Sequence, residues 1–197
     1  MNPDLLDKPA SQGVEEQRLT LDKVTWEQYE TLRDTLENYP GLRITYLEGA
    51  LELFMPSPEH ENIKKTIARL IELYSVETNT RLYGYGSTTY RKKAEARGLE
   101  PDECYCVGEV KEFPDFAIEV IVTSGNIDKL DVYQGLGISE VWFWENDQLS
   151  LYHLRGEKYE SIIKSEFLPS LDINLLVHCA NIPDQYDAVL EFRKAIG

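Results

Sequence analysis

Two short segments constrain the fold most, because they predict neighbouring strands that carry acidic residues. The segments are 99–108 (LEPDECYCVG) and 114–122 (PDFAIEVIV), and Cys, Tyr, Val, Phe and Ile dominate both. Such residues are typical of strands, and a proline is tolerated at the first residue of a strand or on an edge. The polar stretch between them, 108–112, contains one glycine and suits a turn. The sequence therefore predicts an antiparallel hairpin.

Folding this hairpin about its midpoint brings Asp102 opposite Glu119. The midpoint lies between Val110 and Lys111, and both acidic residues are equally far from it along the chain. Directly opposed residues in a sheet have Cβ atoms roughly 4.5–5.5 Å apart. Two carboxylates at that distance repel each other unless a cation or a shared proton lies between them. The hairpin therefore predicts a site for a divalent metal ion.

A second Pro-Asp pair, Pro114-Asp115, offers a competing acid. Asp115 and Glu119 lie on the same face of one strand. At about 3.3 Å per residue their separation is roughly 13 Å, which is too far to share one ion. We therefore interpret Asp115 as a residue that starts the strand.

Length and composition predict one globular domain. The chain has 197 residues, of which 42% are hydrophobic and 28% charged. We expect residues 1–18, which are polar and interrupted by prolines, to be disordered, and residues 19–197 to form a single domain. Since no apolar run approaches the ~18 residues of a membrane span and the N-terminus has no apolar signal core, we expect no membrane partner and a cytoplasmic location. Three cysteines without a CxxC pair argue against a disulfide framework and a zinc ribbon.

The charge distribution gives two opposite indications. A net charge of −15 counts against nucleic-acid binding, because phosphate contacts depend on Lys and Arg. Four cations nevertheless lie close together just before Asp102, namely Arg91, Lys92, Lys93 and Arg97. Two interpretations stay open for this basic cluster: a solvated loop, or a loop that contacts phosphate beside the metal site.

Local signals predict the remaining elements. A capping-box pattern at Thr25 opens an N-terminal helix that stops before Pro40-Gly41, and a hairpin over 43–55 turns near Glu48. Ser57-Pro58 opens a further helix, with serine as N-cap. The other predicted elements are a strand over 81–90, a helix over 126–136, a strand over 140–145, a β-meander over 149–154 and 159–164, and a C-terminal helix from 175 broken near Pro183. This order predicts an α/β or α+β domain, with a mixed sheet flanked by helices.

The order of helix, strand, Pro-Asp strand, Glu strand, helix and strand resembles the core of the PD-(D/E)XK, or restriction-endonuclease-like, nuclease superfamily. More narrowly, the chain resembles the Uma-type family of bacterial endonucleases, long catalogued as a domain of unknown function. The resemblance covers roughly residues 20–180, and it is carried by the stretches YLEGAL (46–51), SPEH (57–60), LEPD (99–102), PDFAIEV (114–120), KLDVY (129–133), GISEVW (137–142) and LPSLD (168–172). It implies a restriction-endonuclease-like core.

The resemblance also implies the roles of individual residues. Asp102 corresponds to the acid of the Pro-Asp motif and Glu119 to the acid of the Glu-x-Lys motif. Their carboxylates, with the backbone carbonyl of Val120, would hold Mg²⁺ or Mn²⁺, hard ions that take oxygen ligands. Where the superfamily carries its lysine, this chain has Ile121. In the Uma-type family the lysine has moved to the following helix, where this chain has Lys129.

Three further residues have two interpretations each. Lys129 either extends its methylenes along an apolar helix face and presents its ammonium to the site, or is a plain surface lysine. His60 either closes off the core-facing stripe of its helix or lies at the rim of a catalytic cleft. Glu48 either supports the site or is merely solvated in its turn. In the first hairpin, the family often has an acidic residue where this chain has Thr45.

The expected activity is metal-dependent hydrolysis of phosphodiester bonds in nucleic acid, with DNA as the expected substrate. Lys129 would orient the attacking hydroxide or stabilise the charged transition state. Two other classes stay open: a binding or regulatory module that keeps the nuclease fold without cutting, and a hydrolase of a small phosphate-containing molecule. The acidic charge and Ile121 favour the module. By analogy with the superfamily, a homodimer would suit cleavage of both strands.

Overall fold

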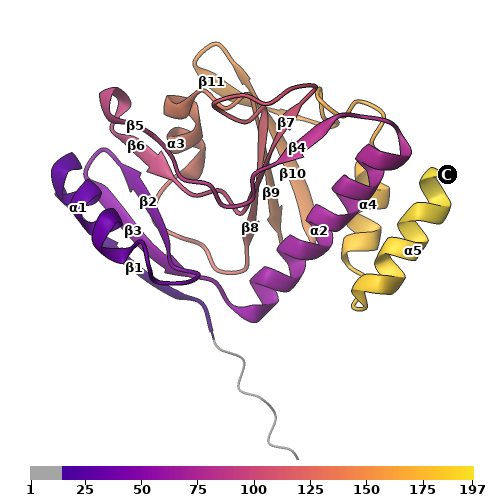
Figure 1. The fold of residues 1–197 in the computed structure, drawn as a ribbon, viewed down its shortest axis with the longest axis horizontal. Coiled ribbons are helices and arrows are strands. Elements are labelled where there is room, and N and C mark those ends of the chain that lie inside the picture. Colours follow the sequence, from indigo (N-terminus) through magenta and orange to yellow (C-terminus); the bar gives the residue numbers. More distant parts are fainter. Residues whose placement is uncertain (1–14) are drawn as a thin grey trace, which may run out of the picture.

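The computed structural model describes residues 15–197, whose strands form two sheets (Figure 1). The first sheet has five strands in the order β1-β3-β2-β6-β5, and all its pairs are antiparallel. Its strands are β1 (Gln17–Leu21), β2 (Arg43–Leu47), β3 (Ala50–Met55), β5 (Tyr90–Lys92) and β6 (Arg97–Leu99).

The second sheet has six strands in the order β11-β10-β9-β8-β7-β4. Its strands are β4 (Leu82–Gly84), β7 (Glu103–Val107), β8 (Phe116–Ile121), β9 (Glu140–Glu145), β10 (Gln148–Arg155) and β11 (Lys158–Ile162). Strands β8 and β9 pair in parallel, whereas the other neighbours pair antiparallel. The predicted mixed sheet is therefore confirmed.

Within residues 15–197, five α-helices flank the sheets: α1 (Trp26–Leu36), α2 (Pro58–Glu77), α3 (Lys129–Leu136), α4 (Ile173–Ala180) and α5 (Gln185–Ile196). In Figure 1, α2, α4 and α5 lie together beside the six-stranded sheet, and α1 lies against the five-stranded one. Helix α3 contacts strands of both sheets, among them β6 and β11. Helix α3 is the crossover connection between the parallel strands β8 and β9.

Most predicted elements are confirmed, and their local causes are visible. Thr25 and Gln28 form the predicted capping box, and the Ser57 side chain accepts a hydrogen bond from the backbone N–H of His60. The first hairpin turns at Glu48 and Gly49, whose φ angles of 48° and 98° are those a type I′ turn requires. The strand over 140–145, the meander and the two-piece C-terminal helix are also present.

Three predictions of local structure are corrected. The strand predicted over 81–90 is split into β4 and, at Tyr90, the start of β5, because Gly86 takes a positive φ of 53° and breaks the extended backbone. The basic cluster does not form a loop: it forms β5, a 3₁₀ turn over 93–95, and β6. The helix predicted from 126 begins at Lys129, because the Asp128 side chain caps it by accepting from the N–H of Leu130.

The predicted disordered segment 1–18 is described only from residue 15. Residues 1–14 lie outside the described residues. Gln17 and Arg18 belong to β1, which pairs with β3 from Gln17 opposite Met55 to Leu21 opposite Leu51. The predicted disordered segment therefore extends too far at its C-terminal end, since residues 17 and 18 belong to β1. This edge strand of the first sheet was not predicted from the sequence.

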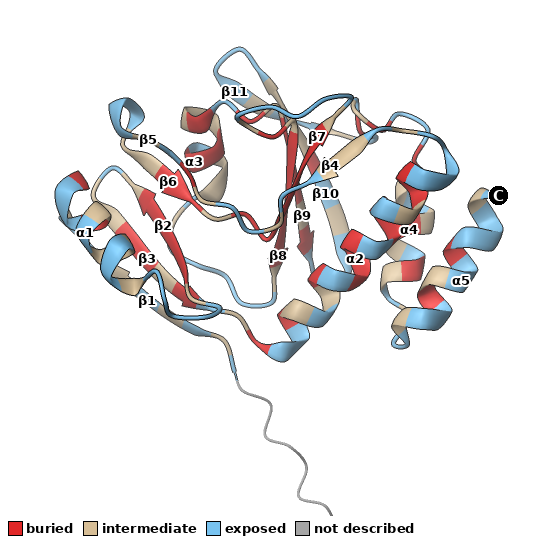
Figure 2. Ribbon diagram, in the orientation of Figure 1, coloured by how far each residue is buried: buried red, intermediate tan, exposed pale blue. Residues whose placement is uncertain are grey.

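The central strands carry the most deeply buried residues (Figure 2). Tyr105, Phe116 and Trp142 stack across β7, β8 and β9, with ring centroids 5.1 Å and 5.0 Å apart, and all three are fully buried. This stack fixes the six-stranded sheet where the predicted metal hairpin lies. The three cysteines are free and buried, as expected for small apolar residues. Within residues 15–197, no helix is long and apolar enough to cross a membrane.

Gly98 tests the packing between α1 and the first sheet. A Cβ added at Gly98 would lie 2.9 Å from Cζ of the buried Tyr29 ring, with the hydroxyl oxygen closer still. We expect Gly98→Ala to lower the free energy of unfolding by about 1–3 kcal/mol, because a closely packed ring has to shift. Urea denaturation measures this. Lys194→Ala, at an exposed position of α5, is the control, and an equal effect of both substitutions would contradict the packing argument.

Candidate functional site

The two predicted carboxylates face each other in the predicted register, with Asp102 directly before β7 and Glu119 within β8. β7 and β8 pair with Tyr105 opposite Phe116 and Glu103 opposite Ile118. Extending this ladder by one residue places Asp102 opposite Glu119. Both are buried, with exposed fractions of 1% and 0%. The competing acid, Asp115, accepts from the N–H of Val107 at 2.7 Å and pairs with Lys111, which leaves it outside the pair.

Asp102 keeps its charge because polar groups surround it. One oxygen, Oδ2, accepts from the backbone N–H of Val120 at 2.8 Å. The other, Oδ1, lies 2.9 Å from Nε2 of His60 and 3.4 Å from Nε of Arg43. Burial disfavours the charged form, but the contact with His60 and the positive charges of Lys129 and Arg43 outweigh it. Together they hold the pKa of Asp102 below its ordinary value.

Glu119 has the opposite shift. Burial raises the pKa of the Glu119 carboxyl, the charge of Lys129 opposes this, and the negative charge of Asp102 adds to it. Its Oε2 accepts a hydrogen bond from the ammonium of Lys129 at 2.5 Å, and its Oε1 accepts one from the hydroxyl of Tyr133. The two neighbouring acids thus differ in proton affinity, an arrangement frequent at functional sites.

Lys129 opens α3 and points its ammonium back into the site. Its side chain is only 16% exposed, and it contacts Glu119, so it is not a plain surface lysine. Burial would lower the pKa of Lys129, but the charges of Glu119 and Asp102 together raise it. The lysine therefore remains an ammonium at neutral pH and serves as a fixed positive charge.

His60 lies between two carboxylates and is fully buried. Its Nδ1 is 2.9 Å from Oε1 of Glu16, and its Nε2 is 2.9 Å from Oδ1 of Asp102. The ring also packs against Phe54, with centroids 5.4 Å apart. His60 therefore ends the buried stripe of α2, as the first interpretation expects, and contacts Asp102. Its role in a catalytic cleft stays a prediction.

The basic cluster and Glu48 make their contacts elsewhere. The partners are Glu30 for Arg91 at 2.8 Å, the carbonyl of Leu136 for Lys92, Glu27 for Lys93 at 3.3 Å, and Glu48 for Arg97 at 3.0 Å. α1, α3 and the first hairpin supply these partners, and Asp102 and Glu119 are not among them. Phosphate contact by this cluster stays a prediction, and it would require these pairs to be exchanged.

Besides Arg43, which contacts Asp102, sequence reasoning missed four polar residues around the site. Glu52 is buried in β3 directly opposite Thr45, with exposed fractions of 2% and 6%. Its Oε1 pairs with Arg18 of β1 at 2.6 Å, and its Oε2 has no hydrogen-bond partner. A glutamate flanked by leucines on a predicted inward strand was the available signal. The others, Glu16, Arg18 and Tyr133, become neighbours of the site only through long-range folding.

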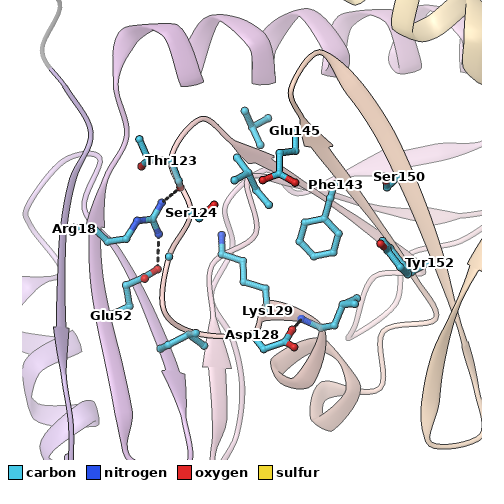
Figure 3. Close-up of a pocket in the computed structure, with 15 residues that line it drawn as sticks. Arg18, Glu52, Thr123, Ser124, Asp128, Lys129, Phe143, Glu145, Ser150 and Tyr152 are labelled. Carbon is cyan, nitrogen blue, oxygen red and sulfur yellow. Dashed lines mark hydrogen bonds and ion pairs between the residues drawn. The ribbon is translucent and has the colours of Figure 1, made fainter.

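A pocket of about 270 Å³ opens beside Lys129 (Figure 3). Arg18 and Glu52 line one side of it and Phe143 and Tyr152 the opposite side, while the Lys129 side chain extends between them. Arg18 also donates to the carbonyl of Thr123 at 3.0 Å, which ties the first sheet to the loop that follows β8. The pocket therefore lies between the two sheets, next to the predicted catalytic lysine.

The donors fit a hard divalent ion with few protein ligands. Asp102 Oδ1 faces His60 and Arg43 without a well-aligned hydrogen bond, so it is the less committed of the two oxygens. No group of three His, Cys, Asp or Glu residues within 15–197 is placed to hold a metal. Mg²⁺ is usually bound through one or two carboxylates and keeps several waters. The predicted set, Asp102, Glu119 and the Val120 carbonyl, is of this kind and stays a prediction. The two Glu119 oxygens accept from Lys129 and Tyr133 in this structure, so an ion would have to share or displace one of these contacts.

Comparison with known proteins adds the family. No curated protein matches this chain. One family, Uma2, described as "Putative restriction endonuclease", matches residues 26–180, which is well over half of the chain and includes Asp102, Glu119 and Lys129. The match agrees with the mixed α and β fold. The chain therefore belongs to the Uma2 family of restriction-endonuclease-like proteins.

Proposed function

We propose that the protein is a metal-dependent endonuclease that hydrolyses phosphodiester bonds in nucleic acid. The observation that carries the proposal is the buried pair of opposed carboxylates, Asp102 and Glu119, with the Lys129 ammonium in contact with the second. A buried acid pair with an adjacent cation contributes little to stability that an apolar core could not supply. Its chemical use is to hold a cation and an anionic substrate together.

Each residue has a role that follows from its surroundings. Asp102 and Glu119, with the Val120 carbonyl, would hold Mg²⁺ or Mn²⁺. Such an ion, when bound, lowers the pKa of a coordinated water and neutralises charge on the phosphate. Lys129 keeps its proton, since its pKa is raised, and therefore orients the attacking oxygen or stabilises transition-state charge rather than accepting a proton. His60 holds the Asp102 carboxylate in position from one side.

The proposal is tested by incubating plasmid, oligodeoxynucleotides and oligoribonucleotides with the protein and Mn²⁺ or Mg²⁺. We expect cleavage that EDTA abolishes and that added Mn²⁺ restores. Isothermal titration should detect binding of Mn²⁺ to the wild-type protein. Absence of cleavage with every substrate would contradict the proposal. Binding of Mn²⁺ without cleavage would then favour a non-cutting module that keeps the metal site.

A non-cutting module is the second candidate, and a specific observation favours it. Each cation of the basic cluster is paired within the chain, and the net charge is −15. A protein that binds Mn²⁺ at Asp102 without cleaving nucleic acid would be this module, and one that hydrolyses a small phosphate ester would be the third class. The homodimer and the cytoplasmic location stay predictions.

A further inference from the structure

The pocket beside Lys129 is small and has two chemically different sides. Its volume of about 270 Å³ is just below the usual range of ligand sites, about 300–1,000 Å³. Arg18, which is paired with Glu52, lies at one side, and Phe143 and Tyr152 offer aromatic surface at the other (Figure 3). The Lys129 side chain extends between them, and its ammonium contacts Glu119. A ligand that fits this division has an anionic end and a flat apolar end, and it is no larger than one nucleotide.

The aromatic side comes from two paired strands. Phe143 lies on β9 and Tyr152 on β10, with ring centroids 5.9 Å apart and ring planes at 75°. Neither is fully buried, so part of each ring is open to the pocket. Glu145 and Ser150 line the same wall and can hydrogen-bond to the polar edge of a base. Aromatic rings beside a cationic backbone contact are the usual platform for an unpaired base.

The surroundings do not suit a long duplex. Binding of a duplex depends on several Lys and Arg contacts to its phosphates. Among the described residues, the basic cluster at 91–97 is held by acidic side chains and a carbonyl. The pocket itself contains Glu52, Asp128 and Glu145, so a phosphate has to enter together with a divalent cation. A single phosphate that binds beside Lys129 together with a divalent cation fits this pocket better than the successive phosphates of a duplex backbone.

We infer that this pocket binds one unpaired nucleotide, with its base against Phe143 and Tyr152 and its phosphate beside Lys129. The substrate class is therefore single-stranded nucleic acid, or the unpaired part of a partly melted duplex. The inference rests on the proposed nuclease function and specifies its substrate. DNA and RNA share the chemistry that the pocket recognises, so both are tested.

Fluorescence anisotropy with labelled oligonucleotides tests this, in the presence of Mn²⁺ and with phosphorothioate linkages that slow cleavage. The arms are single-stranded DNA, single-stranded RNA and the matching DNA duplex. We expect the duplex to bind at least about tenfold more weakly than the single strands. Phe143→Ala should weaken single-strand binding by about tenfold or more, as loss of a stacking platform does.

Matched variants keep the test independent of folding. Phe143→Leu keeps an apolar side chain and loses the aromatic face, so it should weaken single-strand binding as Phe143→Ala does. Phe143→Trp keeps an aromatic face and should bind the single strand about as tightly as the wild-type protein. Tyr39→Ala removes an aromatic ring that is 61% exposed and does not line the pocket, so it should leave the affinity for single strands unchanged. Circular dichroism confirms that each variant folds.

The outcomes separate this inference from the nuclease proposal. Equal affinity for duplex and single strand, or no effect of Phe143→Leu, would overturn the pocket assignment even if the protein cuts DNA. Conversely, if nothing is cut but single-strand binding depends on Phe143, the nuclease proposal fails and the assignment of the pocket to an unpaired nucleotide holds.

Discussion

Asp102→Asn is expected to reduce Mn²⁺-dependent cleavage at least about a hundredfold while the protein stays folded. The substitution keeps the shape of the side chain but removes the negative charge that would hold the ion. Because changes to groups that only support a metal ligand already cost roughly 10–100-fold in metal affinity or activity, loss of a ligand charge should cost at least as much. Initial cleavage rates, measured over a range of Mn²⁺ concentrations, give the value.

Two controls define this result. Asp115→Asn alters the neighbouring Pro-Asp acid, which pairs with Lys111 outside the site, and should leave the rate within a few-fold of wild type. Isothermal titration of Mn²⁺ into Asp102→Asn should show weakened binding in parallel with the lost rate. Cleavage by Asp102→Asn at the wild-type rate would show that another group holds the ion.

Lys129→Met is expected to have the largest effect on stability, lowering the free energy of unfolding by about 3–5 kcal/mol at neutral pH. The substitution leaves the fully buried Glu119 carboxylate without its cation, and an unpaired buried charge carries a cost of this order. Cleavage should be lost as well. Urea denaturation of the variant and the wild type measures the difference.

The double variant Lys129→Met with Glu119→Gln identifies the cause. Since both charges are then absent and the volumes are kept, most of the lost stability should return, while cleavage stays absent. Failure of the double variant to recover stability would mean that packing of Lys129, rather than its charge, is responsible.

The same variant should respond to acid in a defined direction. Glu119 has a folded-state pKa above its ordinary value of 4.5, so the folded protein binds its proton more tightly than the unfolded chain does. The stability that this contributes is complete below about pH 4.5 and is lost as the pH rises through the folded-state value. The deficit of Lys129→Met relative to wild type should therefore shrink as the pH falls toward 4.5 and stay constant below it.

The register of the metal hairpin was predictable because it depends only on local features. Two strand-like segments and a short polar connection set the midpoint, and the midpoint sets which residues face each other. The capping residues at Thr25, Ser57 and the turn at Glu48 were predictable for the same reason, since their hydrogen bonds span a few residues.

The rest of the site depends on contacts between residues far apart in the chain. Glu16 approaches His60, and Arg18 approaches both Glu52 and Thr123, only because β1 pairs with the edge of the first sheet. A polar segment that precedes the first helix carries no periodicity strong enough to predict that pairing. The partners of the basic cluster, which lie on α1, α3 and the first hairpin, were equally unpredictable from the local sequence.

The edge strand β1 has a practical consequence for where this protein can be cut. The family match begins at residue 26, after Glu16 and Arg18. A shortened chain that began there would leave the ring of His60 without its second acid and the Glu52 carboxylate buried without its guanidinium. Recombinant versions trimmed to the family boundary are therefore expected to be less stable and less soluble than the 197-residue chain, for reasons that lie outside the matched region.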